Sequence, residues 1–223
     1  MQPTVERVLA LWTGLAGPGA SFRPGPALHP LVTDEALICP PGWCGLVTIG
    51  DRHLSTAPDA RRARALAQAP AGDRRGVATE ALGPAHLAYL TGPPATGPSE
   101  PVHTDRRVDA LLAACSPADV DESGLADTTS PTFVVLREGA PVAAAGYQRW
   151  TAAGGTAVAH LSVLTHPAFR RHGLARVVGA AATTHAHSHG LLCQWRARPA
   201  ASLRVARALG FTVLGSQLSL LIP

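Results

Sequence analysis

The run Arg170-Arg171-His172-Gly173-Leu174-Ala175 is a short basic segment that stands directly before a helical pattern. Residues 161–165, upstream of it, are mostly apolar and are expected to end a strand. From Leu174 onward, apolar residues recur with the spacing of one helix face, at positions 174, 177, 178, 181 and 182. The run therefore lies at a turn from a strand into a helix.

Such a turn is suited to binding an anion. The first N–H groups of a helix have no intrahelical partner, and they point outward at the positive end of the helix dipole. Gly173 lets a phosphate approach the backbone, the small Ala175 leaves the first turn clear, and the arginines add positive charge. The sequence therefore predicts that this turn binds a phosphate-bearing ligand.

The run also resembles the pyrophosphate loop of the GNAT N-acetyltransferase superfamily, whose pattern is Arg/Gln-x-x-Gly-x-Gly/Ala. It is matched here by Arg170-x-x-Gly173-x-Ala175, with the usual His166-Pro167 before it and residues 208–211 where the second motif ends. The resemblance covers roughly residues 105–223. It implies a GNAT-type α/β (α+β) fold, with a mixed, mostly antiparallel central sheet flanked by helices, and acetyl-CoA as the acyl donor.

The resemblance also implies where the donor would lie. Its pantetheine amides would pair with the strand that ends at Thr165, in the notch where this strand splays from the next, and its diphosphate would lie on the helix turn. The thioester carbonyl would then lie near a strand N–H that can stabilise the oxyanion formed on attack by an amine. The residues implied in donor binding are Val163, Leu164, Thr165, Arg170, Arg171, His172, Gly173, Leu174, Ala175 and Arg176.

Attack requires a neutral amine, so a general base is expected near the acceptor. His160 lies on the strand that should present the thioester, and an imidazole titrates near neutral pH. Glu122 lies in an acidic segment where the family binds its acceptor, and its carboxylate could attract or deprotonate an amine. A structural histidine and a solvated loop charge are the respective alternatives. Trp150 and residues 195–198 are further candidates for the wall of the acceptor cleft.

The usual general acid of the family has no counterpart at its expected position in this sequence. Many relatives carry a Tyr in the final helix, four residues before the Gly of the Gly-Phe pair, but this position is Ala206 here. The usual Asn at the start of that helix is replaced by Pro199, while the small Ser202 is kept. Ser202 or water is the candidate proton donor to the thiolate, and a non-catalytic acyl-CoA-binding regulatory module is the alternative to an N-acetyltransferase.

Residues 91–101 are dense in helix breakers and have no periodicity, so they are the predicted linker between two domains. Residues 101–223 would form the acetyltransferase domain. Residues 1–100 are expected to be an N-terminal α/β region of unassigned fold. This region is either a degenerate second copy of the same fold or a lid that shapes the acceptor site.

Periodicity and turn residues predict the elements along the chain. Helices are expected at 4–15, 58–67, 86–90, 108–115, 174–190 and 199–209, strands at 43–49, 53–56, 132–136, 142–147, 157–165, 191–195 and from 211 onward, and an acidic loop at 116–130.

The composition limits which classes of binding partner are expected. The formal charge is +4, but charged residues are only 15% of the chain and no block of five basic residues occurs, so no nucleic-acid partner is expected. The sequence contains no Lys, which excludes Schiff-base chemistry on lysine. No signal-like start and no apolar run of about 20 residues occur, so a cytoplasmic protein without a membrane partner is expected.

No metal site is expected. The spacing of Cys39 and Cys44 fits neither a redox CxxC motif nor a zinc knuckle. His185, His187 and His189 alternate at the end of a helix, where favourable interaction with the helix C-terminus explains them better than a metal does. The acceptor is expected to be an amine of a small molecule or a peptide, and a homodimer is left open.

Overall fold

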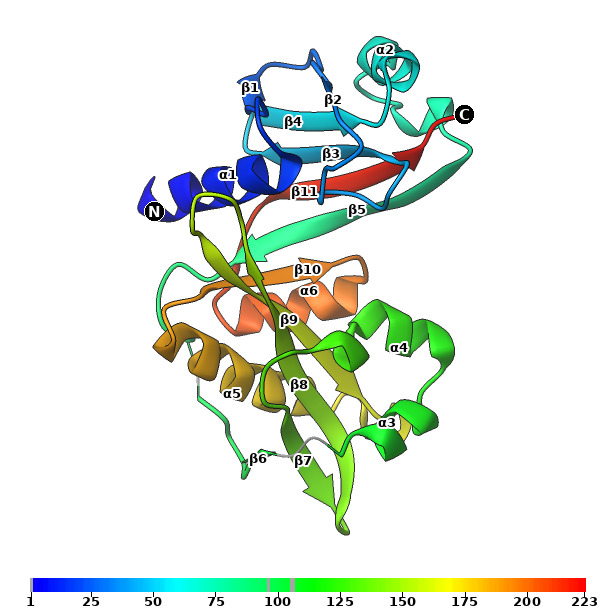
Figure 1. The fold of residues 1–223 in the computed structure, drawn as a ribbon. Helices are drawn as coiled ribbons and strands as arrows, with labels where there is room; N and C mark the ends of the chain where they lie inside the picture. Colours follow the sequence, from blue (N-terminus) through cyan, green and yellow to red (C-terminus); the bar gives the residue numbers. More distant parts are fainter. Residues whose placement is uncertain (1, 96, 105–106) are drawn as a thin grey trace. The chain divides into compact units, whose positions relative to one another are not determined.

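The computed structural model describes residues 2–95, 97–104 and 107–223 (Figure 1). Within this part of the chain there are two compact units. The first consists of Met1–Leu87, Thr151–Thr156 and Val213–Pro223, and the second of Ala88–Trp150 and Ala157–Thr212. The predicted linker lies in the second unit, and its Thr96 lies outside the described residues, as do residues 105 and 106 at the start of the predicted family segment. The separation into domains at residue 100 stays a prediction.

The first unit is built on a sheet with the strand order β1-β4-β3-β11-β5, and β2 pairs with β4. Its core contains Leu46 and Leu220 from the sheet and Leu66 from α2, a helix whose first turn is capped by the side chain of Asp59. Its elements are α1 (Gln2–Ala16), β1 (Arg23–Pro24), β2 (Leu31–Val32), β3 (Cys44–Ile49), β4 (Arg52–Ala57), α2 (Ala60–Gln68), the 3-10 helix η1 (Arg75–Val77), most of β5 (Glu80–Tyr89) and most of β11 (Thr212–Leu221).

The predicted helix at residues 86–90 is wrong, because these residues lie in and just after β5. The side chains of Ala85 and Leu87 are buried while that of His86 is exposed, which is the alternation of a strand. A run of only five residues is too short for periodicity to distinguish a helix from a strand. The other predicted elements of this unit are present, with ends shifted by a few residues.

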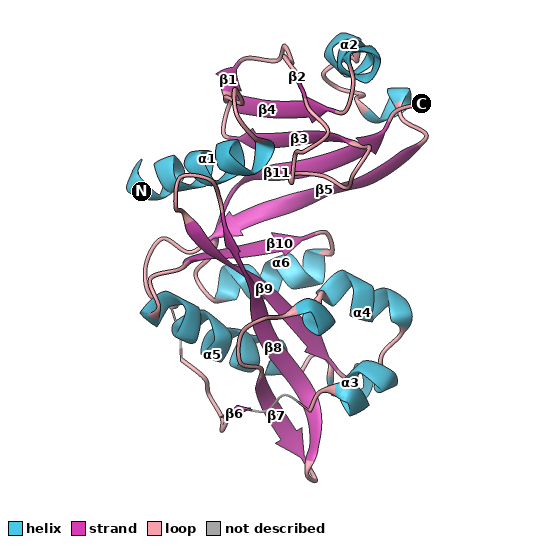
Figure 2. Cartoon of the chain, viewed as in Figure 1, coloured by secondary structure: helices cyan, strands magenta, loops and turns pink. Residues whose placement is uncertain are grey.

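The second unit has the sheet order β10-β9-β8-β7-β6, in which β6, β7 and β8 pair antiparallel and β9 pairs parallel with β10. Figure 2 shows helices on both faces of this sheet. Its elements are β6 (His103–Thr104), α3 (Asp109–Ala114), α4 (Pro117–Ser123), η2 (Leu125–Asp127), β7 (Phe133–Arg137), β8 (Ala140–Thr151), β9 (Ala157–Thr165), η3 (Pro167–Phe169), α5 (Leu174–Ser188), β10 (Leu192–Ala197) and α6 (Ala200–Ala208). The expected fold class, a mixed and mostly antiparallel sheet flanked by helices, is confirmed.

The predicted acidic loop at 116–130 is wrong for its first half, which forms α4. The Oγ of Ser116 accepts a hydrogen bond from the N–H of Asp119 at 3.1 Å, and Pro117 occupies the first turn. Gly124 ends the helix in the left-handed conformation, with φ at +60°. These are ordinary start and stop signals of a helix, which the acidic composition of the segment obscured.

Leu111 of α3 and Leu125 of η2 pack on Val134, Ala144 and Leu164 of the sheet. On α5, buried small and branched residues such as Val178 and Ala182 allow the helix to lie close to the strands, and it contacts β7, β9 and β10. This packing fixes β9 between α4 and α5, the two helices that flank the site described below.

None of the helices in the described ranges combines the length and the hydropathy that a membrane crossing requires. Likewise, no three His, Cys, Asp or Glu side chains of the described residues are grouped to hold a metal ion. His185 instead shares a hydrogen bond of 2.9 Å with the hydroxyl of Tyr147, and His189 shares one with the carbonyl of His185. The four cysteines are free thiols.

Candidate active site

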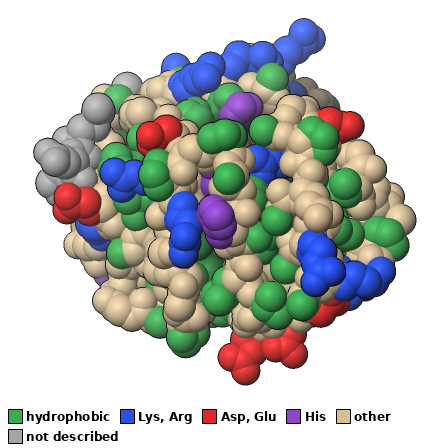
Figure 3. All heavy atoms as spheres, turned by 90° about the horizontal axis from the view of Figure 1, so that it is seen from above, with side chains coloured by type: hydrophobic (Ala, Val, Ile, Leu, Met, Phe, Trp, Pro, Cys, Tyr) green, Lys and Arg blue, Asp and Glu red, His purple; other side chains and the backbone are tan. Residues whose placement is uncertain are grey.

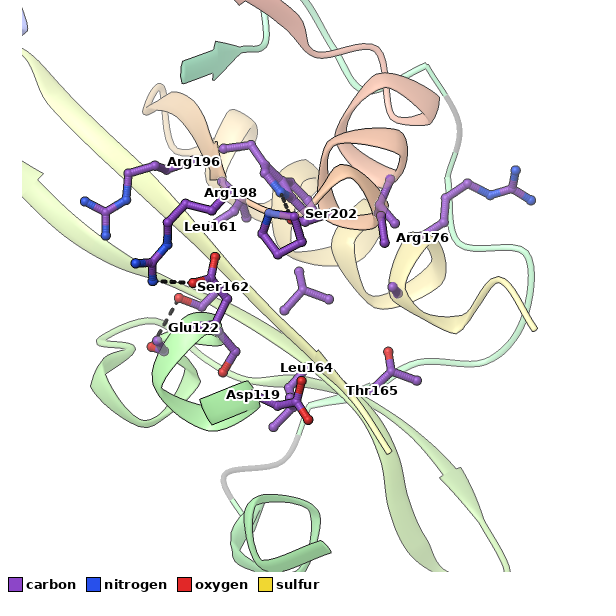
Figure 4. Close-up of a pocket in the computed structure, with 18 of the residues that line it drawn as sticks. Asp119, Glu122, Leu161, Ser162, Leu164, Thr165, Arg176, Arg196, Arg198 and Ser202 are labelled. Carbon is purple, nitrogen blue, oxygen red and sulfur yellow. Dashed lines mark hydrogen bonds and ion pairs between the residues drawn. The ribbon is translucent and has the colours of Figure 1, made fainter. Parts of the chain in front are cut away.

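A cavity of about 820 Å³ opens in the second unit, within the usual size range of ligand sites. Its wall is formed by α4, β9, the turn into α5, the end of β10 and α6 (Figure 4). His172 is exposed and is not part of the wall. The other residues that the sequence assigned to the site all line the cavity: Glu122, His160, Val163, Leu164, Thr165, Arg170, Arg171, Gly173, Leu174, Ala175, Arg176 and Ser202.

The cavity exists because two neighbouring parallel strands part. The register of β9 and β10 runs from Val158 opposite Leu192 to His160 opposite Gln194. Beyond this point β9 continues to Thr165, and the two strands diverge in Figure 1. The backbone of β9 after His160 is therefore available to pair with a ligand. This place corresponds to the notch that the family resemblance implies.

The turn into α5 has the geometry of an anion site. Gly173 stands at the N-cap with φ at +80°, and Arg171 also has a positive φ of 68°. The first backbone hydrogen bonds described for the helix run from the N–H groups of Arg176 and Val177 to the carbonyl of Gly173. The N–H groups of Leu174 and Ala175 precede these bonds in the first turn, where a helix leaves its donors to a ligand or to water.

Arg170 has a second role that the sequence did not indicate. Its Nη2 lies 3.0 Å from a carboxylate oxygen of Asp119, and its Nε donates to the carbonyl of Thr165 at 3.3 Å. Hydrogen bonds from Ser116 and Arg170 lower the pKa of Asp119, so the carboxylate is charged at neutral pH. Arg170 thus connects α4, the end of β9 and the turn formed by residues 170–176, which we call the donor loop.

Glu122 also has a cationic partner. Its carboxylate forms an ion pair with Arg198, just beyond the end of β10, and Figure 4 shows the two side chains meeting. Both side chains remain partly exposed to solvent. The carboxylate that the sequence proposed as a base is therefore held by a guanidinium, on the side of the cavity formed by α4.

His160 lies at the point where the two strands part. Its Nδ1 is 3.0 Å from the Oε1 of Gln194, and its ring stacks on Trp150 with a centroid distance of 4.6 Å and an angle of 14°. Burial and the nearby charge of Arg196 lower the pKa of His160 to about 4, although the hydrogen bond to Gln194 acts in the opposite direction. The imidazole is therefore neutral at physiological pH.

The pH dependence of stability tests this neutral state. The folded pKa of His160 lies below its ordinary value of 6.5, so its contribution to stability is fully present above pH 6.5 and is lost as the pH falls towards 4. His160→Gln cannot titrate, and its amide can still donate to Gln194. We expect this variant to lose less stability than the wild type between pH 7 and pH 5, as measured by urea unfolding. Equal losses in both proteins would contradict the neutral burial of His160.

On α6, the Oγ of Ser202 accepts a hydrogen bond of 2.9 Å from the Nε1 of the buried Trp195. The hydroxyl proton of Ser202 remains available for donation, because accepting a bond does not use it. Ala206, at the position where relatives carry Tyr, is fully buried and is not part of the cavity wall. Ser202 is thus the hydroxyl that α6 presents to the cavity.

Two residues behind the wall were missed by the sequence analysis. Gln194 of β10 and Tyr89 at the end of β5 are both fully buried in the second unit, and the Nε2 of Gln194 donates to the Tyr89 hydroxyl at 2.7 Å. A polar residue in a short apolar strand was the only available signal for Gln194. Nothing in the local sequence of Tyr89 indicated a link to the site.

Residues 132–216 match the family model of the GNAT acetyltransferases. This segment runs from β7 into β11 and includes β9, the donor loop, α5, β10 and α6. The match is confined to this segment, which resembles a GNAT acetyltransferase domain.

Two solved structures show the same fold. One is a protein from Novosphingobium aromaticivorans assigned to the GNAT family, at 17% identity and a TM-score of 0.51, with 64% of this chain and 65% of that chain covered. The other is a GNAT-family acetyltransferase from Colwellia psychrerythraea, at 14% identity and a TM-score of 0.50, with 66% and 59% covered. The chain thus matches less than two thirds of the length of either protein. No curated protein matches the chain significantly.

Proposed function

We propose that the chain is an N-acetyltransferase, which moves the acetyl group of acetyl-CoA to a primary amine of a small molecule or a protein. The observation that carries this proposal is the parting of β9 from β10 beside the N–H groups of the first turn of α5. An exposed strand edge and a helix N-terminus in one cavity suit a long ligand with amides at one end and phosphates at the other.

In this proposal the diphosphate of coenzyme A lies on the turn from Arg171 to Arg176. The pantetheine amides pair with the backbone of residues 163–165, which brings the thioester towards His160. Arg170 orders the loop through Asp119 while its remaining N–H groups add positive charge. A strand N–H near the thioester would stabilise the oxyanion, because it is fixed in place before the charge develops.

The reaction is a direct displacement. The neutral amine attacks the carbonyl carbon of the thioester, and the resulting oxyanion collapses to break the carbon–sulfur bond. The amine nitrogen loses a proton to a base of the cavity, for which His160 and Glu122 are the candidates. The departing thiolate takes up a proton from Ser202 or from water. The products are the amide and free coenzyme A.

The release of free thiol tests the proposal. The purified chain is offered acetyl-CoA with a broad panel of primary amines, and thiol is detected spectroscopically while the acetylated product is identified by mass spectrometry. We expect thiol release that depends on both substrates and yields one equivalent of amide. Tight binding of coenzyme A without turnover across the panel would instead favour a regulatory acyl-CoA-binding module, to which the buried Ala206 in place of a tyrosine lends support.

Glu122→Gln is expected to lower kcat by less than about tenfold, below the usual range for losing a general base. The amide oxygen of the variant can still accept a hydrogen bond from Arg198. The contact between α4 and the end of β10 is therefore kept, while the negative charge is lost. Steady-state kinetics with the best amine of the panel measure this effect. A loss of more than a hundredfold, with affinity for coenzyme A retained, would identify Glu122 as the base.

The remaining expectations on binding partners and cellular location stay predictions. They are that the chain binds neither nucleic acid nor a membrane and is cytoplasmic, and a homodimer is left open. On the face drawn in Figure 3, arginine side chains stand in separate groups with hydrophobic and acidic side chains among them.

A further inference from the structure

A chain of three hydrogen-bonded side chains leads from the core of the second unit to the cavity. Tyr89 and Gln194 are both fully buried, and they are joined by the bond of 2.7 Å from the Gln194 Nε2 to the Tyr89 hydroxyl. The Oε1 of Gln194 then lies 3.0 Å from the Nδ1 of His160, which lines the cavity. Gln194 stands directly opposite His160 in the register of the two strands.

The direction of these bonds determines the state of the imidazole. The Nε2 of Gln194 donates to Tyr89, and its Oε1 can only accept. The Nδ1 of His160 must therefore be the donor in the bond to Gln194. A neutral imidazole carries one N–H, so the proton is on Nδ1 and the lone pair that can accept a proton is on Nε2.

The plane of the ring is fixed as well. Trp150 stacks on His160, and its own Nε1 donates to the Oε1 of Gln148 at 2.9 Å. Trp150 and Gln148 both belong to β8 and both line the cavity. Gln194 thus fixes the tautomer of the imidazole from β10, while Trp150 fixes its orientation from β8.

A buried glutamine is costly unless both ends of its amide are satisfied, and an apolar side chain would fill the same space without this requirement. Gln194 satisfies one end with Tyr89 and the other with His160. The network is therefore complete only when the histidine is in its Nδ1–H form. Such a complete network imposes one protonation state on a residue at the cavity wall.

The charged groups around His160 favour the neutral ring. The charge of Arg196 on β10 acts on His160 and opposes a proton on the imidazole. Glu122 of α4, a carboxylate of the same cavity wall, is already paired with Arg198. The other charged groups of the cavity wall are Asp119, Asp121 and Asp127 on the α4 side and Arg170, Arg171, Arg176 and Arg204 on the side of α5 and α6.

We propose that Tyr89 and Gln194 are positioning residues that hold His160 as its Nδ1–H tautomer, so that the Nε2 of His160 is the general base of acetyl transfer. The assignment rests on the proposed function. When the amine has attacked, its nitrogen becomes cationic and strongly acidic, so a base of low pKa suffices to remove the proton. The proton passes from the nitrogen to Nε2 and then to water, which restores the neutral ring.

The tautomer can be measured without any turnover. Long-range proton–nitrogen correlation spectra of the ¹⁵N-labelled chain, with His160→Gln to assign the signals, show which ring nitrogen carries the proton at pH 7. We expect the Nδ1–H form for His160 and no protonation down to about pH 5. An Nε2–H form, or titration near the ordinary pKa, would overturn the proposal even if the chain proves to be an active acetyltransferase.

Gln194→Glu tests the link to catalysis with a side chain of the same shape. A carboxylate beside the Nδ1–H stabilises the imidazolium, and an opposite charge at this distance raises a histidine pKa by about one to three pH units. The acidic limb of the pH profile of kcat/KM should move to higher pH by that amount. Gln217→Glu, at another buried glutamine in β11, should leave the limb in place. If Gln194→Glu lowers kcat/KM by the same factor at every pH, Gln194 has only a structural role.

Tyr89→Phe removes one hydroxyl and keeps the ring that fills the core. It should loosen Gln194 and lower kcat about two- to tenfold with little change in KM, while the spectra show the His160 tautomers in exchange. An unchanged rate together with an unchanged tautomer would remove Tyr89 from the proposal. If wild-type chain releases no thiol with any amine, the proposed function fails, whereas the spectra still decide the state of His160.

Discussion

His160→Ala is expected to lower kcat for acetyl transfer by about 10²- to 10³-fold, the usual contribution of a general base. The imidazole is the group of the cavity whose proton state is fixed by a buried network, and its free nitrogen can accept the proton of the attacking amine. Affinity for coenzyme A should be unchanged, because the donor loop and the edge of β9 after residue 160 do not depend on this side chain. Steady-state kinetics and calorimetric titration with coenzyme A separate the two effects.

His187→Ala is a matched control for this experiment. His187 is exposed near the end of α5, outside the cavity wall, so its replacement should leave kcat and the affinity for coenzyme A at wild-type values. His160→Gln provides a second variant that keeps a hydrogen bond to Gln194 if the alanine variant unfolds. A loss of less than tenfold in both His160 variants, with both folded, would exclude His160 as the base.

The part of the cavity wall that we assign to the donor could be outlined from the sequence because its signals are local. A strand, a basic turn, a glycine and the onset of a helical pattern lie within about fifteen residues of each other, and each has a physical meaning by itself. The exception is His172, which is exposed and lies outside the wall. Its place in the motif could not show on which side of the turn its side chain would lie.

The part of the cavity wall that we assign to the acceptor could not be outlined to the same degree, because its contacts are distant in the sequence. Glu122 meets Arg198, and Gln194 meets Tyr89 at a separation of 105 residues. These pairs depend on which strands are neighbours and in what register, and neither is encoded in local periodicity. The sequence could nominate Glu122 and His160 as bases, but only the folded chain shows that one is ion-paired and the other is fixed by a buried amide.

Gly173→Val is the second prediction with a large effect, and it concerns the donor. Gly173 adopts a φ of +80°, and a β-branched residue in this conformation is strained by about 1–2 kcal/mol. Nothing lies within 4 Å of a Cβ added there, so the strain comes from the backbone and not from a clash. The free loop should relax away from the binding conformation, and restoring it on binding lowers the affinity for coenzyme A by about 5- to 30-fold.

Gly190→Val separates strain from binding. Gly190 lies just beyond the other end of α5, also has a positive φ, of 71°, and also has open space around an added Cβ. Gly190→Val should lose stability in urea unfolding by up to the strain of about 1–2 kcal/mol, and Gly173→Val should lose no more than this, because its free loop relaxes. Only Gly173→Val should lose affinity for coenzyme A in calorimetric titration, since only this glycine begins the turn that lines the cavity. If both variants lose affinity equally, general destabilisation explains the effect, and the donor loop is not the phosphate site.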